Sequence, residues 1–267
     1  MSKRLLTSVV ILAIIIIYAY VISALAPFDP RRWNVVPPNQ PPSLKYPFGT
    51  TSLGQDLFWL CAQALRYSIT MSLITGLIGI AIAMIIGVIG GYLRGKAFTA
   101  ITLFIDSFCV IPALPVLVLL FSLWREAINP LTMALWIAVF SWAWPSRYIR
   151  STVMSLRERT FTYTARFSGY SLIDSIRYHY LPYIFGLLIS GLLNIMLWAI
   201  GIETTLAVFG LLSLAEPTLG LIIFWAMNYL ALPRGIWWWI AFPVALLVTL
   251  IVSMYFISLE LYRRYVL

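Results

Sequence analysis

Long stretches of apolar residues set the first limit on how this chain folds. Residues 5–26 form a nearly unbroken apolar run behind Lys3 and Arg4, and further runs of this kind follow. A helix that crosses the hydrocarbon core of a bilayer needs about 20 apolar residues. Only 10% of the residues are charged, whereas a water-soluble domain averages about 25%. We therefore expect an all-α polytopic membrane protein.

The apolar runs predict about six transmembrane helices, at residues 5–26, 67–93, 97–124, 131–144, 183–202 and 236–259. The first run ends in Ser-Ala-Leu-Ala, which resembles a signal-peptidase site, so a cleaved signal peptide is the alternative. The apolar region of a signal peptide has about 7–15 residues. This run is longer, which favours a retained helix. The fourth run is short, but Pro130 and Pro145 bracket it.

Two further apolar stretches, 204–215 and 219–232, are too short for a comfortable crossing, which takes roughly 17–25 residues. Gly210, Pro217 and Gly220 interrupt them. We expect an outer re-entrant segment at about 204–232. Such backbone is tolerated at membrane depth only where protein or a water-filled cavity surrounds it. One more true span is the alternative, and it would move the C-terminus across the membrane.

The basic residues predict an orientation, because they collect on the cytoplasmic side of membrane proteins. With six helices and a cytoplasmic N-terminus, the inner set is Lys3, Arg4, Arg94, Lys96, Arg147, Arg150, Arg157, Arg159, Arg166, Arg177, Arg263 and Arg264. The outer set is half as large: Arg31, Arg32, Lys45, Arg66, Arg125 and Arg234. Trp237, Trp238 and Trp239 would then anchor the outer end of the last helix. The net charge of +9 therefore needs no nucleic-acid partner.

This orientation divides the chain into four parts. They are an N-terminal transmembrane helix (1–26), an extracellular or periplasmic loop (27–66), a core of membrane helices (67–260) and a cytoplasmic tail (261–267). In the outer loop, Gly49, Gly54 and Asp56 are expected to form a structured turn that positions the loop. Both termini would be cytoplasmic.

A polar stretch closes the longest predicted cytoplasmic loop, residues 146–181. Gly169 suits the position after a helix end, because glycine takes a left-handed backbone without a Cβ penalty. Ser171 and Asp174 have the spacing of a capping box and predict the start of a short helix. Pro182 is expected to stop this helix from running smoothly into the next span.

The short helix is predicted to be amphipathic. One face carries Leu172, Ile173, Ile176 and Tyr180, whereas Asp174 and Arg177 lie elsewhere on the helix. Three interpretations remain open on these residues alone. The helix rests on lipid headgroups, or it is an ordinary connecting loop with a solvated basic face, or it docks into a groove of a partner protein.

Spacing within the same stretch resembles a known family. Gly169 is followed after nine residues by His179-Tyr180-Leu181-Pro182, which is similar to the G-x9-I-x-L-P half of the EAA loop. That loop marks the permease subunits of binding-protein-dependent ABC importers. Other segments, in family order over about 46–260, resemble the C-type permeases of the dipeptide, oligopeptide and nickel group: YPFGTTSLGQD at 46–56, DSFCVIPALPVLVL at 106–119, WAWPSRYIRSTVMSLRER at 142–159 and ETTLAVFGLLS at 203–213. The chain departs from the pattern at Tyr163-Thr164-Ala165, which stands in place of E-A-A, and at Gly54-Gln55-Asp56, which stands in place of G-R-D.

The resemblance implies the type I ABC importer permease fold, with residues 67–260 as the permease core and a cytoplasmic coupling helix in an EAA-like loop at about 160–182. It implies a cell-membrane permease for dipeptides, oligopeptides, oligosaccharides or nickel. The implied partners are a second homologous permease as a heterodimer, two cytoplasmic ATP-binding subunits and an extracellular solute-binding protein. ATP and Mg would be used by the ATPases, and this chain would bind no cofactor. The residues expected to couple it to the ATPases are Ala165, Gly169, Ser171, Leu172, Ile173, Asp174, Ile176, Arg177, Leu181 and Pro182.

Four further residues are candidates for the translocation pathway. Asp106 lies about 15 Å along its predicted helix, and intramembrane carboxylates often line pathways. The favoured alternative is that it hydrogen-bonds to a neighbouring helix. Pro112 and Pro115 are expected to kink that helix, for gating or for packing. Glu203 would begin the outer re-entrant segment and face the pore mouth or the binding protein, unless it is simply an acid near a helix N-terminus.

Other functional classes fit less well. The sequence contains no G-x4-GK[ST] phosphate loop, so ATP would have to be hydrolysed by a partner. A stand-alone secondary transporter or channel, the main alternative, would be expected to show inverted repeats and paired intramembrane charges. An intramembrane enzyme would need a nucleophile with its base or a set of zinc ligands. His179 is the only histidine, and Cys61 and Cys109 match no metal or redox spacing, so we expect free thiols and no metal site.

Overall fold

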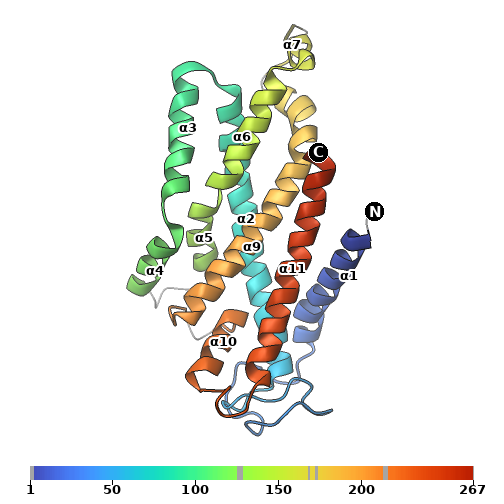
Figure 1. Cartoon of the computed structure of the whole chain (residues 1–267), viewed down its shortest axis with the longest axis vertical. Coiled ribbons are helices and arrows are strands. Elements are labelled where there is room, and N and C mark those ends of the chain that lie inside the picture. Colours follow the sequence, from blue (N-terminus) through green and yellow to red (C-terminus); the bar gives the residue numbers. More distant parts are fainter. Residues whose placement is uncertain (1–2, 125–128, 168, 172–173, 213–215, 267) are drawn as a thin grey trace.

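The computed structural model describes residues 3–124, 129–167, 169–171, 174–212 and 216–266. They form an elongated helical bundle with the 27–56 segment at one end and α7 at the other (Figure 1). The helices are α1 (Lys3–Ile17), η1 (Tyr18–Ile22), α2 (Leu57–Tyr92), α3 (Gly95–Val110), α4 (Ala113–Leu123), α5 (Pro130–Ser141), α6 (Ala143–Arg157), α7 (Thr160–Phe167), η3 (Ser175–Tyr180), α9 (Leu181–Val208), α10 (Leu219–Asn228) and α11 (Trp238–Val266).

Several helices have the length and composition of membrane spans. Within the described ranges, four qualify alone: α1 with η1, then α2, α9 and α11. Helices α3 and α4 qualify together as a fifth, with a bend of 68° between them. Pro112 occupies the break between the two helices, which confirms the predicted kink in the 97–124 run. The fold class is confirmed as all-α and polytopic.

The fourth predicted span, 131–144, is wrong in its boundaries. Helix α5 has 12 residues and begins at Pro130, behind a capping box formed by Asn129 and Thr132. It ends at Ser141, and α6 starts at Ala143. Pro145 therefore lies in the first turn of α6 instead of ending the span. A proline is tolerated there because the first N–H groups of a helix have no partner within it.

Other predicted boundaries also need correction. Helix α2 begins at Leu57, so the last part of the predicted 27–66 loop is helical. Helix α9 continues to Val208, and only residues 219–228 of the predicted 204–232 segment form a separate short helix, α10. Helix α11 runs to Val266, so most of the predicted tail at 261–267 belongs to it. The apolar runs thus predict where the helices lie, but not where they end, because the helices continue into the residues that flank the runs.

Helix α2 is the central element of the bundle. It has 36 residues, which corresponds to about 54 Å, and packs against α5, α6 and α9. Glycines bring α6 close to it. A Cβ added at Gly87 would lie 2.9 Å from Ile149 Cβ, and one added at Gly91 would lie 2.7 Å from Val153 Cβ. Small residues allow this backbone approach, which drives association between membrane helices.

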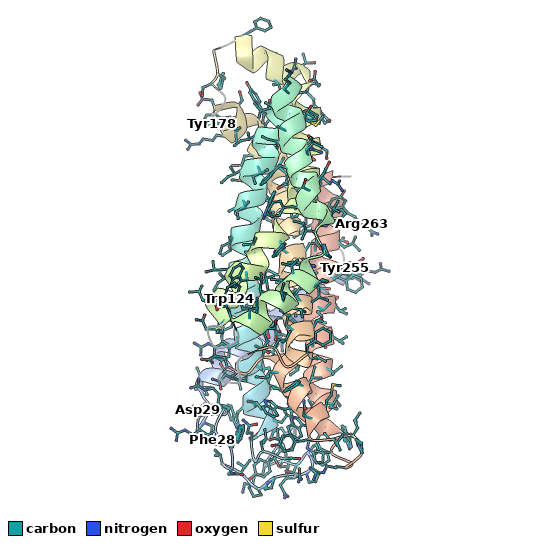
Figure 2. All side chains as sticks on the ribbon, turned by 90° about the vertical axis from the view of Figure 1, so that its left-hand side faces the viewer. Phe28, Asp29, Trp124, Tyr178, Tyr255 and Arg263 are labelled. Atoms are coloured by element: carbon teal, nitrogen blue, oxygen red, sulfur yellow. The ribbon has the colours of Figure 1, made fainter. Side chains whose placement is uncertain are left out.

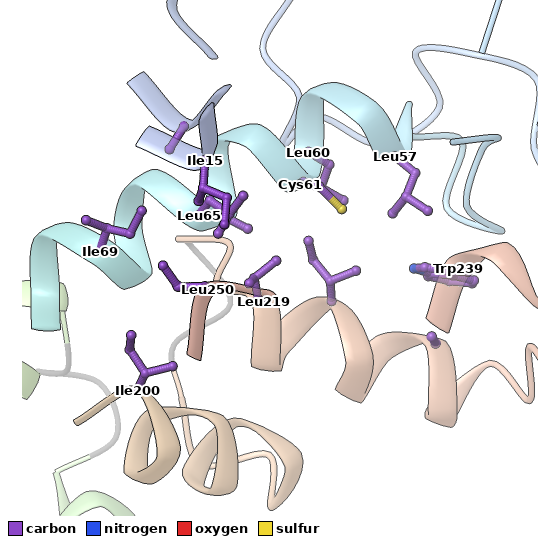
Figure 3. Packing of buried hydrophobic residues seen from close by; sticks show 14 of the residues in the cluster. Ile15, Leu57, Leu60, Cys61, Leu65, Ile69, Ile200, Leu219, Trp239 and Leu250 are labelled. Atoms are coloured by element: carbon purple, nitrogen blue, oxygen red, sulfur yellow. The ribbon is translucent and has the colours of Figure 1, made fainter. Parts of the chain in front are cut away.

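The end of the bundle that holds the 27–56 segment has its own apolar core. It joins α1, α2, α9, α10 and α11, with Ile15, Leu65 and Leu250 among the buried side chains (Figure 3). The hydroxyl of Tyr18 donates a hydrogen bond to the Phe58 carbonyl at 2.6 Å. The N-terminal helix therefore packs as part of this core, and its retention in the cell stays a prediction.

Two of the three tryptophans at the start of α11 do not form the predicted interfacial anchor. Trp238 and Trp239 are buried, whereas Trp237 is exposed. The indole Nε1 of Trp238 donates to the Thr50 carbonyl at 3.1 Å. These side chains hold the 27–56 segment against the bundle. Phe28 and Asp29 lie in that segment, and Tyr178 lies near the opposite end (Figure 2).

The close contact between α2 and α6 generates a prediction. We expect Gly87→Ala to destabilise the protein by about 1–3 kcal/mol, because the added Cβ overpacks the contact. The measurement is the thermal midpoint of the protein purified in detergent. Gly201→Ala is the matched control, since a Cβ there meets nothing within 4 Å. Equal effects of the two substitutions would show that the glycine contact does not govern stability.

Candidate functional site

The polar stretch predicted from the sequence forms an elbow at one end of the bundle, which we define as residues 160–182. It comprises α7, Gly169–Ser171, η3 and the first turn of α9 (Figure 1). Gly169 has φ +81°, which confirms the predicted left-handed conformation. A Cβ added there would meet nothing within 4 Å. The position therefore selects glycine for its backbone angle and not for lack of space.

A capping box starts the second half of the elbow, as predicted. The Ser171 N–H and hydroxyl both donate to Asp174 Oδ2, at 3.1 and 2.5 Å, and the Asp174 N–H donates to Ser171 Oγ at 3.2 Å. The hydrogen bond from the Ser171 hydroxyl holds the pKa of the Asp174 carboxyl below its usual value. Leu172 and Ile173 lie outside the described residues, and Ala165 is part of α7.

The predicted stop at Pro182 is wrong. Residues Ser175–Tyr180 form a π-helical turn that runs directly into α9, with the Leu181 N–H bonded to the Ile176 carbonyl. Pro182 follows in the first turn of α9. A proline removes one i→i−4 hydrogen bond and its ring crowds the carbonyl of residue i−4, here Tyr178. The π turn is wider than an α-helical turn and so relieves the crowding between the proline ring and the Tyr178 carbonyl. The chain therefore continues as one helix.

The two faces of the elbow differ. Tyr180 is fully buried, and Ile176 and Leu181 pack beside it against the core that includes Ile149 on α6. Tyr178 points outward with 57% of its surface exposed (Figure 2). The Arg177 guanidinium lies 5.5 Å from the Tyr178 ring centroid. Ile176 and Tyr180, the described residues of the predicted apolar face, are thus turned toward the bundle, whereas Tyr178 points away from it.

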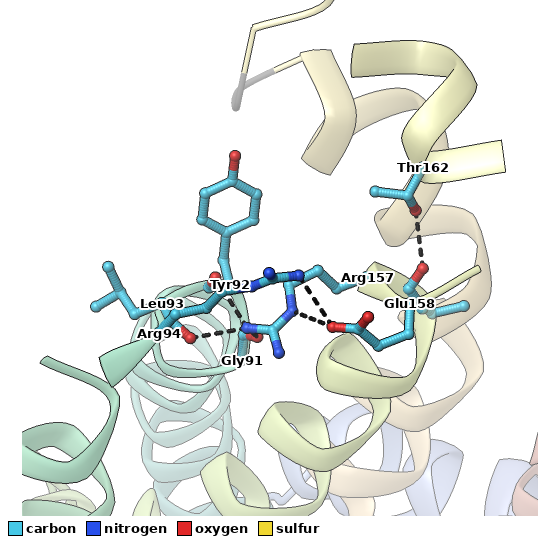
Figure 4. A network of polar contacts seen from close by, with 8 residues as sticks. Gly91, Tyr92, Leu93, Arg94, Arg157, Glu158 and Thr162 are labelled. Atoms are coloured by element: carbon cyan, nitrogen blue, oxygen red, sulfur yellow. Dashed lines mark hydrogen bonds and ion pairs between the residues drawn. The ribbon is translucent and has the colours of Figure 1, made fainter. Parts of the chain in front are cut away.

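Arg157, at the end of α6, forms a network of polar contacts beside the elbow (Figure 4). Its Nη1 donates to the carbonyls of Gly91, Tyr92 and Leu93 at 3.2, 3.2 and 2.8 Å. Its Nε donates to Glu158 Oε1 at 3.0 Å. The carbonyls at the end of a helix lack partners within it, and a cation there also complements the helix dipole. Arg157 therefore caps the C-terminus of α2.

The sequence assigned Arg157 only an orientation role. A basic residue at the end of a helix was visible in the sequence, but its acceptors belong to a helix more than sixty positions away. Arg147 was likewise assigned to orientation, and the sequence did not identify it as the partner of Asp106. In the structure, Arg147 donates to Asp106 Oδ1 through Nη2 at 2.8 Å and Nε at 3.0 Å. The pair joins α3 to α6. This agrees with the favoured alternative, in which Asp106 hydrogen-bonds to a neighbouring helix.

A cavity of about 480 Å³ opens beside the break between α3 and α4. Pro112 and Pro115 contribute to its wall, together with Trp144, Asn194 and Trp198. The remaining lining residues are Phe108, Cys109, Ile111, Ala113, Leu114, Phe140, Ser141, Pro145, Tyr148, Ile195 and Ile202. Of the four residues predicted for the pathway, the structure brings the two prolines to this cavity. Asp106 and Glu203 are not among its lining residues.

Glu203 neither begins a re-entrant segment nor lies near the N-terminus of a helix, which corrects both interpretations of the sequence. It lies inside α9 and is fully buried. Ser68 Oγ on α2 donates to its Oε2 at 3.4 Å. A Cβ added at Gly220 would lie 3.2 Å from its Oε1, so glycine lets α10 approach the carboxyl group. Glu203 thus sits where α2, α9 and α10 meet.

Metal-ligating side chains do not cluster in the described ranges. Within them, no three His, Cys, Asp or Glu side chains come together in a way that could hold a metal ion. Cys61 is buried, Cys109 is half-buried, and both are free thiols, as expected. What the described part of the chain offers is an exposed elbow, a cavity beside a broken helix and polar contacts that tie helices together.

The chain resembles known transport proteins over most of its length. OppC, an oligopeptide transport system permease protein of Mycobacterium tuberculosis, is 29% identical over 255 residues, which cover 94% of this chain and 86% of that protein. The dipeptide transport system permease protein DppC of Bacillus subtilis is 26% identical over 100% of this chain and 79% of its own length. The nickel transport system permease protein NikC of Escherichia coli is 26% identical over 61% of this chain and 58% of its own length.

A solved structure shows the same fold. The MetNI methionine ABC transporter, in an inward-facing conformation, contains a chain that aligns with a TM-score of 0.61 and 17% identity. The alignment covers 78% of this chain and 97% of that one. Residues 79–266 match the family described as binding-protein-dependent transport system inner membrane component. This match spans well over half of the sequence and confirms the resemblance predicted from the elbow and the segments around it. The chain therefore belongs to the family of inner membrane components of binding-protein-dependent transport systems.

Proposed function

We propose that this permease forms half of the translocation pathway of an ATP-driven importer for peptides or a related solute. The observation that carries the proposal is the family match over residues 79–266. The relatives OppC, DppC and NikC are named for oligopeptide, dipeptide and nickel transport. The first two match almost the whole chain, which favours a peptide. The other half of the pathway comes from a second homologous permease.

The elbow end faces the cytoplasm in this proposal, and the 27–56 end faces outward. The start of α1 and the end of α11 both point toward the end of the bundle that carries α7 (Figure 1). Basic residues also gather toward that end, with Arg94, Arg157 and Arg177 on or beside the elbow. Such residues mark the cytoplasmic side of membrane proteins. An extracellular solute-binding protein would then deliver its cargo to the 27–56 end.

Two cytoplasmic ATPases supply the energy through the elbow. The sequence has no phosphate-binding loop of its own, so ATP and Mg are used by these partners. The exposed Tyr178 and Arg177 give the elbow a face of the composition that protein interfaces favour. Closure of the ATPases would shift the elbow and thereby bias two arrangements of the helix bundle.

The cavity beside the broken helix belongs to this chain's share of the pathway. Its volume, about 480 Å³, falls in the range of small-molecule sites. Trp144 and Trp198 supply apolar surface, and Asn194 supplies an amide that can both donate and accept hydrogen bonds. A mainly apolar wall with few polar groups suits a solute that must pass without being held tightly.

The defining experiment reconstitutes the permease pair with its ATPases in proteoliposomes and supplies the solute-binding protein with a peptide library. We expect uptake that requires ATP and stops when an ATPase is left out. Peptide uptake that continues without ATPase or ATP would overturn the proposal and favour a stand-alone transporter or channel.

Gly169 provides the first test of the elbow. We expect Gly169→Val to lower peptide uptake while ATP hydrolysis and membrane insertion persist, because a β-branched residue with positive φ strains the turn that fixes the elbow. Gly169→Asn is the matched control, since asparagine tolerates the left-handed region. The measurement is uptake per ATP hydrolysed. Equal uptake by the two variants would identify the elbow as an ordinary loop.

The exposed aromatic face provides the second test. Tyr178→Ala should reduce co-purification of the ATPase about 5- to 30-fold, the effect of losing an aromatic contact worth 1–2 kcal/mol. Tyr255→Ala on α11 is the control, because Tyr255 is exposed to a similar extent, 51% against 57%, but lies away from the elbow (Figure 2). If both variants retained the ATPase equally well, docking through this face would be ruled out.

A further inference from the structure

We propose that Arg157 is the positioning residue that joins the elbow to α2, so that movement of the elbow carries α2 with it. This inference rests on the proposed function of the elbow. Arg157 ends α6, and α7 begins three positions later at Thr160. Thr162 Oγ1 donates to the Leu156 carbonyl at 2.8 Å, which ties α7 back to the end of α6. The elbow and Arg157 are thus connected over a short distance.

The contact between Arg157 and α2 is built from strong interactions. The guanidinium spans three consecutive carbonyls of α2 and one carboxylate, and its side chain is only 16% exposed. Arg94 also reaches Glu158, at 3.1 Å, but these two side chains are 63% and 52% exposed. Exposed ion pairs contribute little. Arg157 therefore makes the main polar contact between the end of α6 and α2. A lysine cannot reproduce this contact, because its ammonium group lacks the planar set of donors of a guanidinium.

The packing of α6 on α2 extends this joint along the helix. Gly87 and Gly91 let the α6 side chains, such as Ile149, rest directly on the α2 backbone. A contact of this kind has little room to slide, because a displaced side chain would meet backbone atoms. The carbonyls that Arg157 caps belong to the same last turns of α2. Side-chain packing and hydrogen bonding thus fix α6 and α2 as one body.

Helix α2 carries this motion to the opposite end of the bundle. It runs without a break from Tyr92, beside the elbow, to Leu57, where Asp56 caps its first turn. On the way, Ser68 reaches the buried Glu203, beside which α10 packs. The segment from Gly91 to Ser68 spans about 35 Å at 1.5 Å per residue. A push received at the elbow therefore arrives where α2, α9 and α10 meet.

The test compares Arg157→Gln with Arg159→Gln in the assembled transporter. Arg159 is an exposed arginine two positions away, so both variants lose one charge at the same end of the molecule. We expect Arg157→Gln to lower uptake per ATP hydrolysed by about 10-fold, within the range found for residues along coupling networks. Arg159→Gln should match the wild type. The amount of assembled complex is measured in parallel, because a purely structural role would reduce assembly and not the ratio.

Arg157→Lys completes the set. It keeps the positive charge and therefore the orientation signal, yet lacks the fork, so uptake per ATP hydrolysed should fall as for Arg157→Gln. This variant replaces Arg157→Gln should the latter not assemble. Wild-type coupling in Arg157→Lys would overturn the inference, as would equal coupling in Arg157→Gln and Arg159→Gln.

The Gly169 and Tyr178 variants show which idea has failed. If they uncouple or release the ATPase while the Arg157 variants behave as wild type, the elbow receives the force but passes it on by another route. If none of these variants has an effect, the elbow itself is not the coupling element.

Discussion

The close contact between α2 and α6 sets how the neighbouring helices of the bundle are arranged. Lipid chains are as apolar as leucine, so burial of oily surface cannot hold two membrane helices together. Close packing must do so, and Gly87 and Gly91 provide it by letting Ile149 and Val153 rest on the α2 backbone. The position of α6 also fixes where α5, which precedes it, and the elbow, which follows it, lie in the bundle. The 36-residue α2 then serves as the axis around which α5, α6 and α9 are arranged.

Polar groups within this apolar bundle connect one helix to another. Asp106 and Arg147 link α3 to α6, Ser68 and Glu203 link α2 to α9, and Arg157 links α6 to the end of α2. A buried polar group without a partner is costly, so each such pair favours one arrangement of helices over its alternatives. These links lie at different levels of the bundle: Arg157 at the end of α2 beside the elbow, Ser68 in the other half of α2, and Arg147 on α6. They therefore connect neighbouring helices at several points along the bundle.

Features that depend on neighbouring residues could be predicted from the sequence. The positive φ of Gly169, the Ser171–Asp174 capping box and the kink at Pro112 all follow from local backbone chemistry. Features that depend on distant contacts could not. The partner of Asp106, the burial of Trp238 and the acceptors of Arg157 are set by packing between remote segments. The predictions from two prolines were also wrong. Pro145 lies in the first turn of α6, and Pro182 lies in the first turn of α9 directly after a π turn. A proline is tolerated in a first turn and does not end the helix there.

The π turn at Ser175–Tyr180 has a consequence for how the elbow is oriented. A π turn holds one residue more than the α-helical turn it replaces, and each residue of an α-helix rotates the chain by about 100°. The extra residue therefore sets the direction in which Tyr178 points relative to the faces of α9. Exchange between π and α geometry in this turn would swivel the elbow about the axis of α9 while the helix below stayed intact. The π turn would thus let the elbow change its orientation without a break in the helix that follows.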